Sequence, residues 1–81
     1  MAIRPGTSTV REVELRNRIR VFRAERRWSQ AELARRIGVS RKTISTIEVG
    51  RFVPSTIIAL LIAREFETSV EAVFSIDDGS S

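Results

Sequence analysis

The 81-residue sequence contains no cysteine and no histidine. A disulfide framework is therefore excluded, and a zinc site made of the usual Cys and His ligands cannot be built. Nucleophilic catalysis through Cys–His or Ser–His pairs lacks its base. General acid–base chemistry would depend on carboxylates or on Lys42, in a chain too small to enclose a deep pocket. We therefore expect a protein that is not an enzyme and that binds no metal and no cofactor.

Long apolar runs are also missing from the sequence. The most apolar stretch, residues 57–63, has seven residues, whereas a membrane-spanning helix needs about 20. No apolar segment follows Arg4, so we expect no secretory signal. These features predict a cytoplasmic protein without a membrane partner.

Basic residues are concentrated in one part of the chain. Residues 1–51 contain thirteen of the fourteen Lys and Arg residues and five of the ten acidic ones, whereas residues 52–81 contain one basic residue and five acidic ones. All of the basic residues except Lys42 are arginine, which binds phosphate and guanine through paired hydrogen bonds. A codon bias would explain arginine in place of lysine, but it would not explain the clustering. The distribution indicates a surface that binds a polyanion.

The first part of the chain predicts an arm followed by a helix. Residues 1–11 are rich in turn-forming residues near their start, and we expect them to form a flexible arm. The pattern becomes helical from about Val10, because Leu15, Ile19 and Phe22 recur at i, i+4 and i+7. This first helix is expected to end near Arg26.

Two short helices joined by a very short turn follow. Ser29 and Glu32 have the spacing of a capping box, which predicts a second helix at about 30–37 that ends at Gly38. Ser40 is the expected N-cap of a third helix at about 41–49. Because one residue separates Gly38 from Ser40, the two helices must cross at a steep angle. The expected core of this unit is Leu33, Ala34, Ile37, Val39, Ile44 and Ile47.

The last part of the chain predicts two more helices. Ser55 is the expected N-cap of a fourth helix whose residues 57–63 are apolar all round, so this helix is buried on more than one side. Ser69 caps a short last helix that includes Phe74, and residues 77–81 form a polar tail. We expect an all-α fold, a compact five-helix bundle over residues 12–76 with no strand.

Several motifs in this order carry a resemblance to a known family. They are Phe22-Arg23, Ser29-Gln30-Ala31-Glu32-Leu33-Ala34, Ile37-Gly38-Val39-Ser40, Thr43-Ile44-Ser45, Ile47-Glu48-Val49-Gly50-Arg51, Pro54-Ser55, Ser69-Val70 and Val73-Phe74. Over residues 17–74, in register and without a gap, the sequence resembles the Cro/repressor type of helix-turn-helix protein, also called the XRE (xenobiotic response element) type. It is most similar to the short stand-alone members of that family.

The resemblance implies a phage-repressor-like fold in which the third helix is the recognition helix and enters the major groove. The positions that would contact bases are Ser40, Arg41, Lys42, Ser45 and Thr46. Arg41 and Lys42 have the length and the donors to reach guanine O6 and N7. The alternative is a solvated helix face that contacts only phosphates.

The resemblance also implies residues that contact the DNA backbone. These are Gln30, Arg35, Thr43, Arg51 and Thr56. Gln30 lies in the first turn of the second helix, where free amides favour an anion, and in the family this glutamine also braces a residue of the recognition helix. Arg23 and Glu48 match a pair that forms a structural salt bridge between the first and third helices in many relatives.

The sequence departs from the family pattern at three places. Glu67 and Thr68 stand where a Gly-Val pair is usual, so the fourth helix lacks its C-terminal glycine. Val49 stands where a polar residue is common, and it could pack on the core or against a partner. The N-terminal arm has no family counterpart, although Arg4 and Arg11 could follow the DNA backbone or enter a minor groove.

These observations predict a transcription regulator that binds double-stranded DNA sequence-specifically. We expect a bacterial or phage repressor, associated with the nucleoid, that binds an inverted-repeat operator as a homodimer and needs no small-molecule effector. The candidate dimer surfaces are Ile57, Ile58, Leu61, Val70, Phe74 and residues 49–52, which could equally be core. Two alternatives stay open: a DNA-binding antitoxin of a toxin–antitoxin pair, and a protein-interaction module that has lost DNA binding.

Overall fold

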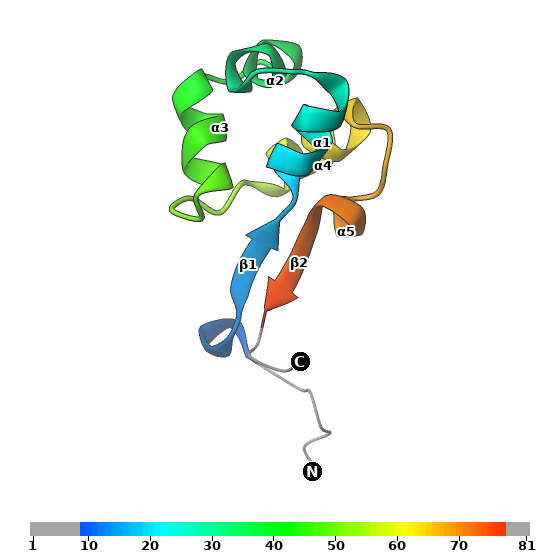
Figure 1. Cartoon of the computed structure of the whole chain (residues 1–81). Coiled ribbons are helices and arrows are strands. Elements are labelled where there is room, and N and C mark those ends of the chain that lie inside the picture. Colours follow the sequence, from blue (N-terminus) through cyan, green and yellow to red (C-terminus); the bar gives the residue numbers. More distant parts are fainter. Residues whose placement is uncertain (1–8, 78–81) are drawn as a thin grey trace.

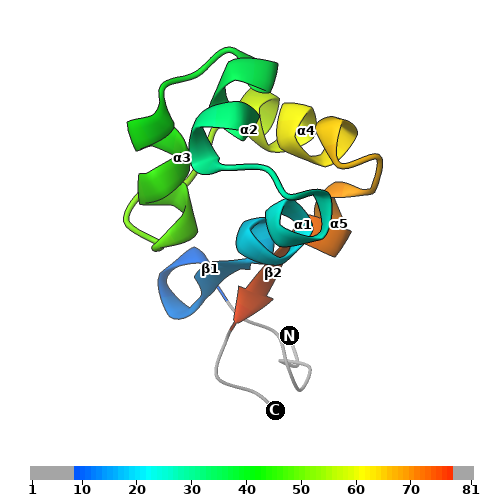
Figure 2. The ribbon, with the colours of Figure 1, turned by 45° about the horizontal axis from the view of Figure 1, so that its top comes forward.

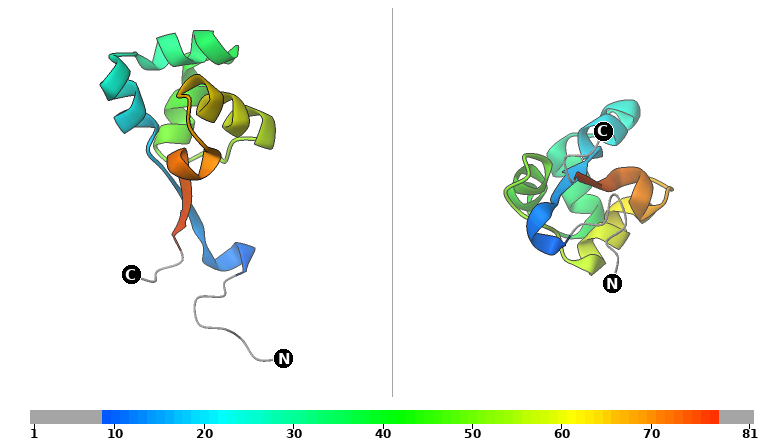
Figure 3. Two further views of the ribbon diagram at one scale, coloured as in Figure 1. Left: turned by 90° about the vertical axis from the view of Figure 1, so that its right-hand side faces the viewer. Right: turned by 90° about the horizontal axis from the view of Figure 1, so that it is seen from below.

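The computed structural model describes residues 9–77 of the chain. Within this range, five α-helices surround the core: α1 (Ile19–Arg26), α2 (Gln30–Ile37), α3 (Arg41–Glu48), α4 (Thr56–Glu65) and α5 (Val70–Val73). A 3₁₀ helix, η1 (Val10–Glu12), and two strands, β1 (Glu14–Asn17) and β2 (Phe74–Asp77), complete the fold. The helices form one body, from which the two strands project side by side (Figures 1 and 3).

The two-stranded sheet corrects the all-α prediction. β1 and β2 pair antiparallel, with Leu15 opposite Ile76 and Asn17 opposite Phe74. Exposure alternates along β1: Glu14 and Arg16 are exposed, and Leu15 and Asn17 are half-buried. A stretch of four residues is too short for that alternation to outweigh the apparent helical spacing, and the pairing partner lies about sixty residues away in the sequence.

The first and last helices are shorter than expected for the same reason. The helix predicted from about Val10 begins at Ile19, and Phe74 belongs to β2 and not to the last helix. The predicted flexible arm over residues 1–11 is structured at its end, because the Thr9 amide and hydroxyl both donate to the Glu12 carboxylate at the start of η1. Asp77, expected in the polar tail, lies in β2. The expectations for Arg4 and for residues 78–81 lie outside the described residues.

Four of the five α-helices in the described range begin at a serine side chain. The hydroxyls of Ser29, Ser40, Ser55 and Ser69 each accept a hydrogen bond from the backbone amide three residues later. Only half of the capping box predicted at Ser29 is present, because the Glu32 carboxylate instead pairs with Arg35 and Arg36. Gly38 ends α2 with a positive φ of 81°, as predicted.

The core lies where the five helices meet. Its buried members are Ile19, Leu33, Ala34, Ile44, Ile47, Ile62, Ala63, Phe66, Val73 and Phe74. Of the predicted core residues, Ile37 and Val39 are partly buried and pack against this cluster. Trp28 covers it, stacked on Phe66 with ring centroids 5.8 Å apart. None of the helices within residues 9–77 combines the length and the hydrophobicity that a membrane-spanning segment needs.

Candidate nucleic-acid interface

Helix α3 presents a polar face to solvent at the edge of the molecule. Ile44 and Ile47 are buried on its inner side, against the core. Arg41 and Lys42 in its first turn are exposed, and Ser45 is half-buried. The short turn after α2 makes α3 cross that helix steeply, as the sequence predicted, so the outer face of α3 is uncovered (Figures 1 and 2).

A chain of hydrogen bonds connects three helices behind this face. Arg41 Nη1 donates to Gln30 Oε1 over 3.3 Å, and Gln30 Nε2 donates to Glu48 Oε1 over 3.3 Å. Arg23 Nε and Nη2 then donate to the two Glu48 carboxylate oxygens over 2.7 and 3.1 Å. The first turn of α2 therefore holds one exposed arginine of α3, while α1 holds the other end of α3.

The ion pair predicted between Arg23 and Glu48 is present and largely shielded from solvent. The Arg23 side chain is 15% exposed and the Glu48 side chain 8% exposed. Arg23 Nη1 also donates to the Trp28 carbonyl over 2.8 Å. Both partners thus meet several of their hydrogen-bonding needs inside the protein, which is what a shielded ion pair requires.

The hydroxyl groups of α3 are mostly engaged within the helix. Ser40 Oγ accepts from the Thr43 amide over 3.1 Å and lies 2.9 Å from Thr43 Oγ1. Thr46 Oγ1 donates to the carbonyls of Lys42 and Thr43 over 2.9 and 3.0 Å. Thr46 therefore offers a base its methyl group or oxygen lone pairs, since its proton is already shared between two carbonyls.

The other residues expected to contact phosphates have different surroundings. Arg51 and Thr56 are exposed, one after α3 and the other at the first position of α4, behind the Ser55 cap. Arg35 is engaged in an ion pair, with Arg35 Nη2 2.6 Å from Glu32 Oε2. This hydrogen bond lowers the pKa of the Glu32 carboxyl and raises the pKa of Arg35. A phosphate at Arg35 would have to replace or join that carboxylate.

Arg36, the neighbour of Arg35, contacts other parts of the protein and thereby stabilises the fold. Its guanidinium lies 3.9 Å from the centroid of the Trp28 ring and pairs with Glu32 and Glu65. These contacts connect α2 to α4, and the guanidinium covers the Trp28 ring. Arg36 is therefore less available to a phosphate than Arg51.

Asn17 is the residue that sequence reasoning missed. Its Nδ2 donates to the carbonyls of Ile47 and Glu48 at the end of α3, over 3.1 and 3.4 Å. Its Oδ1 accepts from the amide of Ile19 over 3.2 Å. An asparagine before a helix suggests a cap, but the contact to α3, thirty residues away, has no local sequence signal.

The described residues offer no group of three or more carboxylates that could hold a metal ion. Their buried side-chain nitrogen and oxygen atoms all have hydrogen-bond partners. The polar groups that α3 offers to a ligand are thus the exposed Arg41 and Lys42 and the short hydroxyl side chains beside them.

Comparison with known proteins agrees with this geometry. Residues 19–73 match the helix-turn-helix family model. The chain is 45% identical over 64 residues to an uncharacterized HTH-type transcriptional regulator of Archaeoglobus fulgidus. The alignment covers 79% of this chain and 91% of that protein. It is also 36% identical over 64 residues to the HTH-type regulator YgzD of Bacillus subtilis, covering 79% of this chain and 97% of that protein.

A solved structure has the same fold. The crystal structure of the clp gene regulator ClgR from Corynebacterium glutamicum superimposes with a TM-score of 0.61 at 31% identity, over 64% of this chain and 55% of that chain. These relatives are named as regulators, which agrees with the prediction from composition that this chain is not an enzyme. The chain belongs to the XRE-type helix-turn-helix family of DNA-binding transcription regulators.

Proposed function

We propose that this protein is a repressor that binds an inverted-repeat operator in double-stranded DNA as a homodimer and excludes RNA polymerase from the promoter. The observation that carries the proposal is the outer face of α3. Arg41 and Lys42 are exposed there, and within residues 9–77 neither side chain has an acidic partner. Two unpaired cations at the start of an exposed helix suit the edges of guanine bases.

The roles of the individual residues follow from this placement. Arg41 and Lys42 read bases, and Ser40, Ser45 and Thr46 make shorter contacts along the same face. Gln30 supports this face, because it holds the Arg41 guanidinium 3.3 Å from its own amide oxygen before DNA arrives. Backbone phosphates are bound by Gln30, Arg35, Thr43, Arg51 and Thr56.

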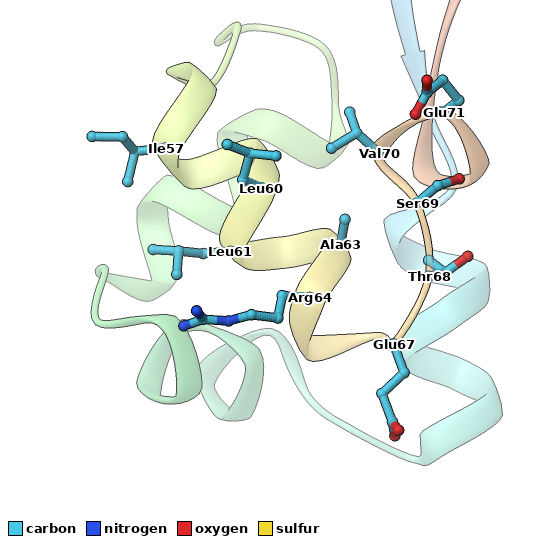
Figure 4. A pocket seen from close by; sticks show the side chains of 10 residues that line it. All are labelled: Ile57, Leu60, Leu61, Ala63, Arg64, Glu67, Thr68, Ser69, Val70 and Glu71. Carbon is cyan, nitrogen blue, oxygen red and sulfur yellow. The ribbon is translucent and has the colours of Figure 1, made fainter.

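The proposed dimer is supported by an apolar groove between α4 and α5. Figure 4 shows Leu60 and Ala63 on the side of α4 that faces Val70, whereas Ile57 and Leu61, which also line the groove, project from the other side of α4. Ile57 is 70% exposed and Leu60 is 54% exposed, which is unusual for large apolar side chains on one helix. A single helical domain makes few base contacts, whereas a two-fold dimer places two recognition helices about 34 Å apart, one turn of DNA.

The same groove supports the antitoxin alternative, in which a toxin covers the apolar residues in place of a second copy. The third possibility, an interaction module that has lost DNA binding, would have no need for unpaired cations at Arg41 and Lys42. The interaction module predicts no binding in the experiment below, whereas the antitoxin would bind DNA as the repressor does and differs in what covers the groove.

The test is the binding of DNA by the full chain. Duplexes are selected from a random library by the protein, and fluorescence anisotropy compares the selected duplex with a scrambled one at two salt concentrations. We expect a preference of about 10³-fold or more that persists at the higher salt concentration, with two protein chains per duplex. Equal and steeply salt-dependent binding of both duplexes would mean that only phosphates are read. Absence of binding would favour the interaction module.

A further inference from the structure

At its C-terminal end the recognition helix is joined to the rest of the molecule by the Arg23–Glu48 pair and, through its backbone, by the side chain of Asn17. The last carbonyl groups of an α-helix have no partner within the helix. In α3, the carbonyls of Ile47 and Glu48 accept hydrogen bonds from Asn17 Nδ2 over 3.1 and 3.4 Å. The N-terminal end of α3 depends on a different residue, the Ser40 cap. Asn17 therefore acts on the end of the helix that the cap does not reach.

Asn17 is itself held from two sides. It lies at the end of β1, opposite Phe74 of β2, whose side chain is 7% exposed and belongs to the core. The next amide, that of Arg18, donates to the Val73 carbonyl over 2.8 Å. The Asn17 oxygen also accepts from the Ile19 amide at the start of α1. The side chain thus has little freedom, and its hydrogen bonds to α3 transmit the position of the sheet to the helix.

We propose that Asn17 is a positioning residue for DNA recognition. It sets the angle at which α3 presents Arg41 and Lys42, without itself reaching the DNA. This inference rests on the proposed function, in which those two residues read bases. The two-stranded sheet then has a role in recognition, because it carries Asn17.

The substitution Asn17→Ser separates the two halves of the contact. A serine hydroxyl can still accept from the amide two residues later, which preserves the start of α1. It is too short to reach the Ile47 and Glu48 carbonyls. Asn17→Asp is the isosteric variant, which keeps the acceptor for Ile19 but places carboxylate oxygen against two carbonyl oxygens. We expect Asn17→Asp to be the more severe of the two.

Glu14→Ser is the matched control, since it introduces the same residue in the same strand. Glu14 is exposed, and its carboxylate lies 3.5 Å from the Arg16 guanidinium. The control should change neither α3 nor base discrimination.

The decisive readout is the ratio of affinities for the selected and the scrambled duplex. A loss of global stability lowers both affinities by the same folded fraction and leaves this ratio unchanged. For Asn17→Ser we expect the ratio to fall about five- to tenfold, the effect of losing one or two ordinary hydrogen bonds. Hydrogen exchange of the Val49, Gly50 and Arg51 amides, which bond to carbonyls of α3, should become about tenfold faster, with α2 unchanged.

The outcomes distinguish this inference from the proposed function. A wild-type protein with no preference for its selected duplex would overturn the proposed function, and this inference with it. A wild-type preference that Asn17→Ser retains in full would overturn the role of Asn17 alone. A reduced ratio together with faster exchange at the end of α3 is the result that supports it.

Discussion

The Arg23 guanidinium lies 2.7 Å from the Glu48 carboxylate and connects α1 to the last residue of α3. Because the side chains are 15% and 8% exposed, neither charge can be satisfied by water alone if its partner is removed. Gln30 joins the same carboxylate and also holds Arg41. One shielded carboxylate therefore stabilises both the fold and, through Gln30, the orientation of the exposed Arg41 side chain.

Arg23→Ala is expected to lower the free energy of unfolding by about 3 kcal/mol, because it leaves the Glu48 carboxylate shielded and without its cation. The double variant Arg23→Ala/Glu48→Ala should lose little more than the single one, since no unpaired charge remains. Urea unfolding followed by circular dichroism measures the loss of stability in each single variant, Arg23→Ala and Glu48→Ala, and in the double variant. If the loss in the double variant equals the sum of the two single losses, the two side chains act independently.

Arg41→Ala and Arg51→Ala should affect DNA binding in different ways. Arg41→Ala should cost about 1–3 kcal/mol on the selected duplex and relax the base preference at one position. Arg51→Ala should weaken binding to selected and scrambled duplexes alike and reduce the slope of log K against log salt by about one. Anisotropy titrations over a range of salt concentrations test this, and equal losses on both duplexes for both variants would contradict the division of roles.

Helices α2 and α3 were predictable because their signals are local. Ser29 and Ser40 are each followed by the apolar spacing of a helix, and Gly38 ends the first of these helices. The Arg23–Glu48 pair was predictable only through the resemblance, since no rule of spacing connects residues twenty-five apart. Residue type and spacing thus indicated α2 and α3 closely.

The sheet and the Asn17 contact could not be predicted in the same way. β1 has four residues, and what makes it a strand is Phe74 and its neighbours at the other end of the chain. Asn17 meets α3 only because that pairing forms. The strand and the Asn17 contact therefore both depend on contacts between residues far apart in the sequence, which hydrophobic periodicity does not detect.

Glu67 shows a different limit of sequence reasoning, and it yields a stability prediction. The usual glycine is missing after α4, yet the chain still adopts the left-handed turn there, with φ of 56° at Glu67. Glu67→Gly should therefore stabilise the protein by about 0.5–1 kcal/mol, because glycine adopts this conformation without strain. Glu71→Gly, which makes the same charge change within α5, should destabilise it by about 1 kcal/mol. Thermal unfolding compares the two, and a loss of stability in Glu67→Gly would contradict the account.

The Glu32–Arg35 pair gives a prediction for acidic pH. The hydrogen bond from Arg35 lowers the pKa of the Glu32 carboxyl in the folded protein. The favourable interaction is present above the unfolded-state pKa, and it is lost as the pH falls through the lower folded-state pKa. Both groups lie at the surface, so we expect a shift in titration and little change in stability.

Arg35→Ala should raise the pKa of Glu32 toward its ordinary value, as followed by NMR of the side-chain carboxyl carbon. Arg51→Ala, which removes an arginine elsewhere on the surface, is the control and should leave that pKa in place. If Glu32 titrates at the same pH with and without Arg35, the ion pair does not form in solution.

The apolar groove between α4 and α5 gives the last prediction. Because Ile57 is 70% exposed in the monomer, Ile57→Glu should leave folding intact. At a two-fold interface, however, the substitution would bring two buried carboxylates together, and the dimer should dissociate. Sedimentation equilibrium should then show a monomer, and operator binding should weaken because each half-site would bind its chain independently.

Val21→Glu is the control for that experiment. Val21 is a 44% exposed valine on α1, outside the groove, and its substitution adds the same charge. It should leave both the dimer and its stoichiometry on DNA unchanged. If Ile57→Glu also remains a dimer, the two copies meet elsewhere, and the groove is free for a different protein, as the antitoxin alternative requires. If only Ile57→Glu dissociates, the groove is the dimer interface, because the added charge is the same in both variants.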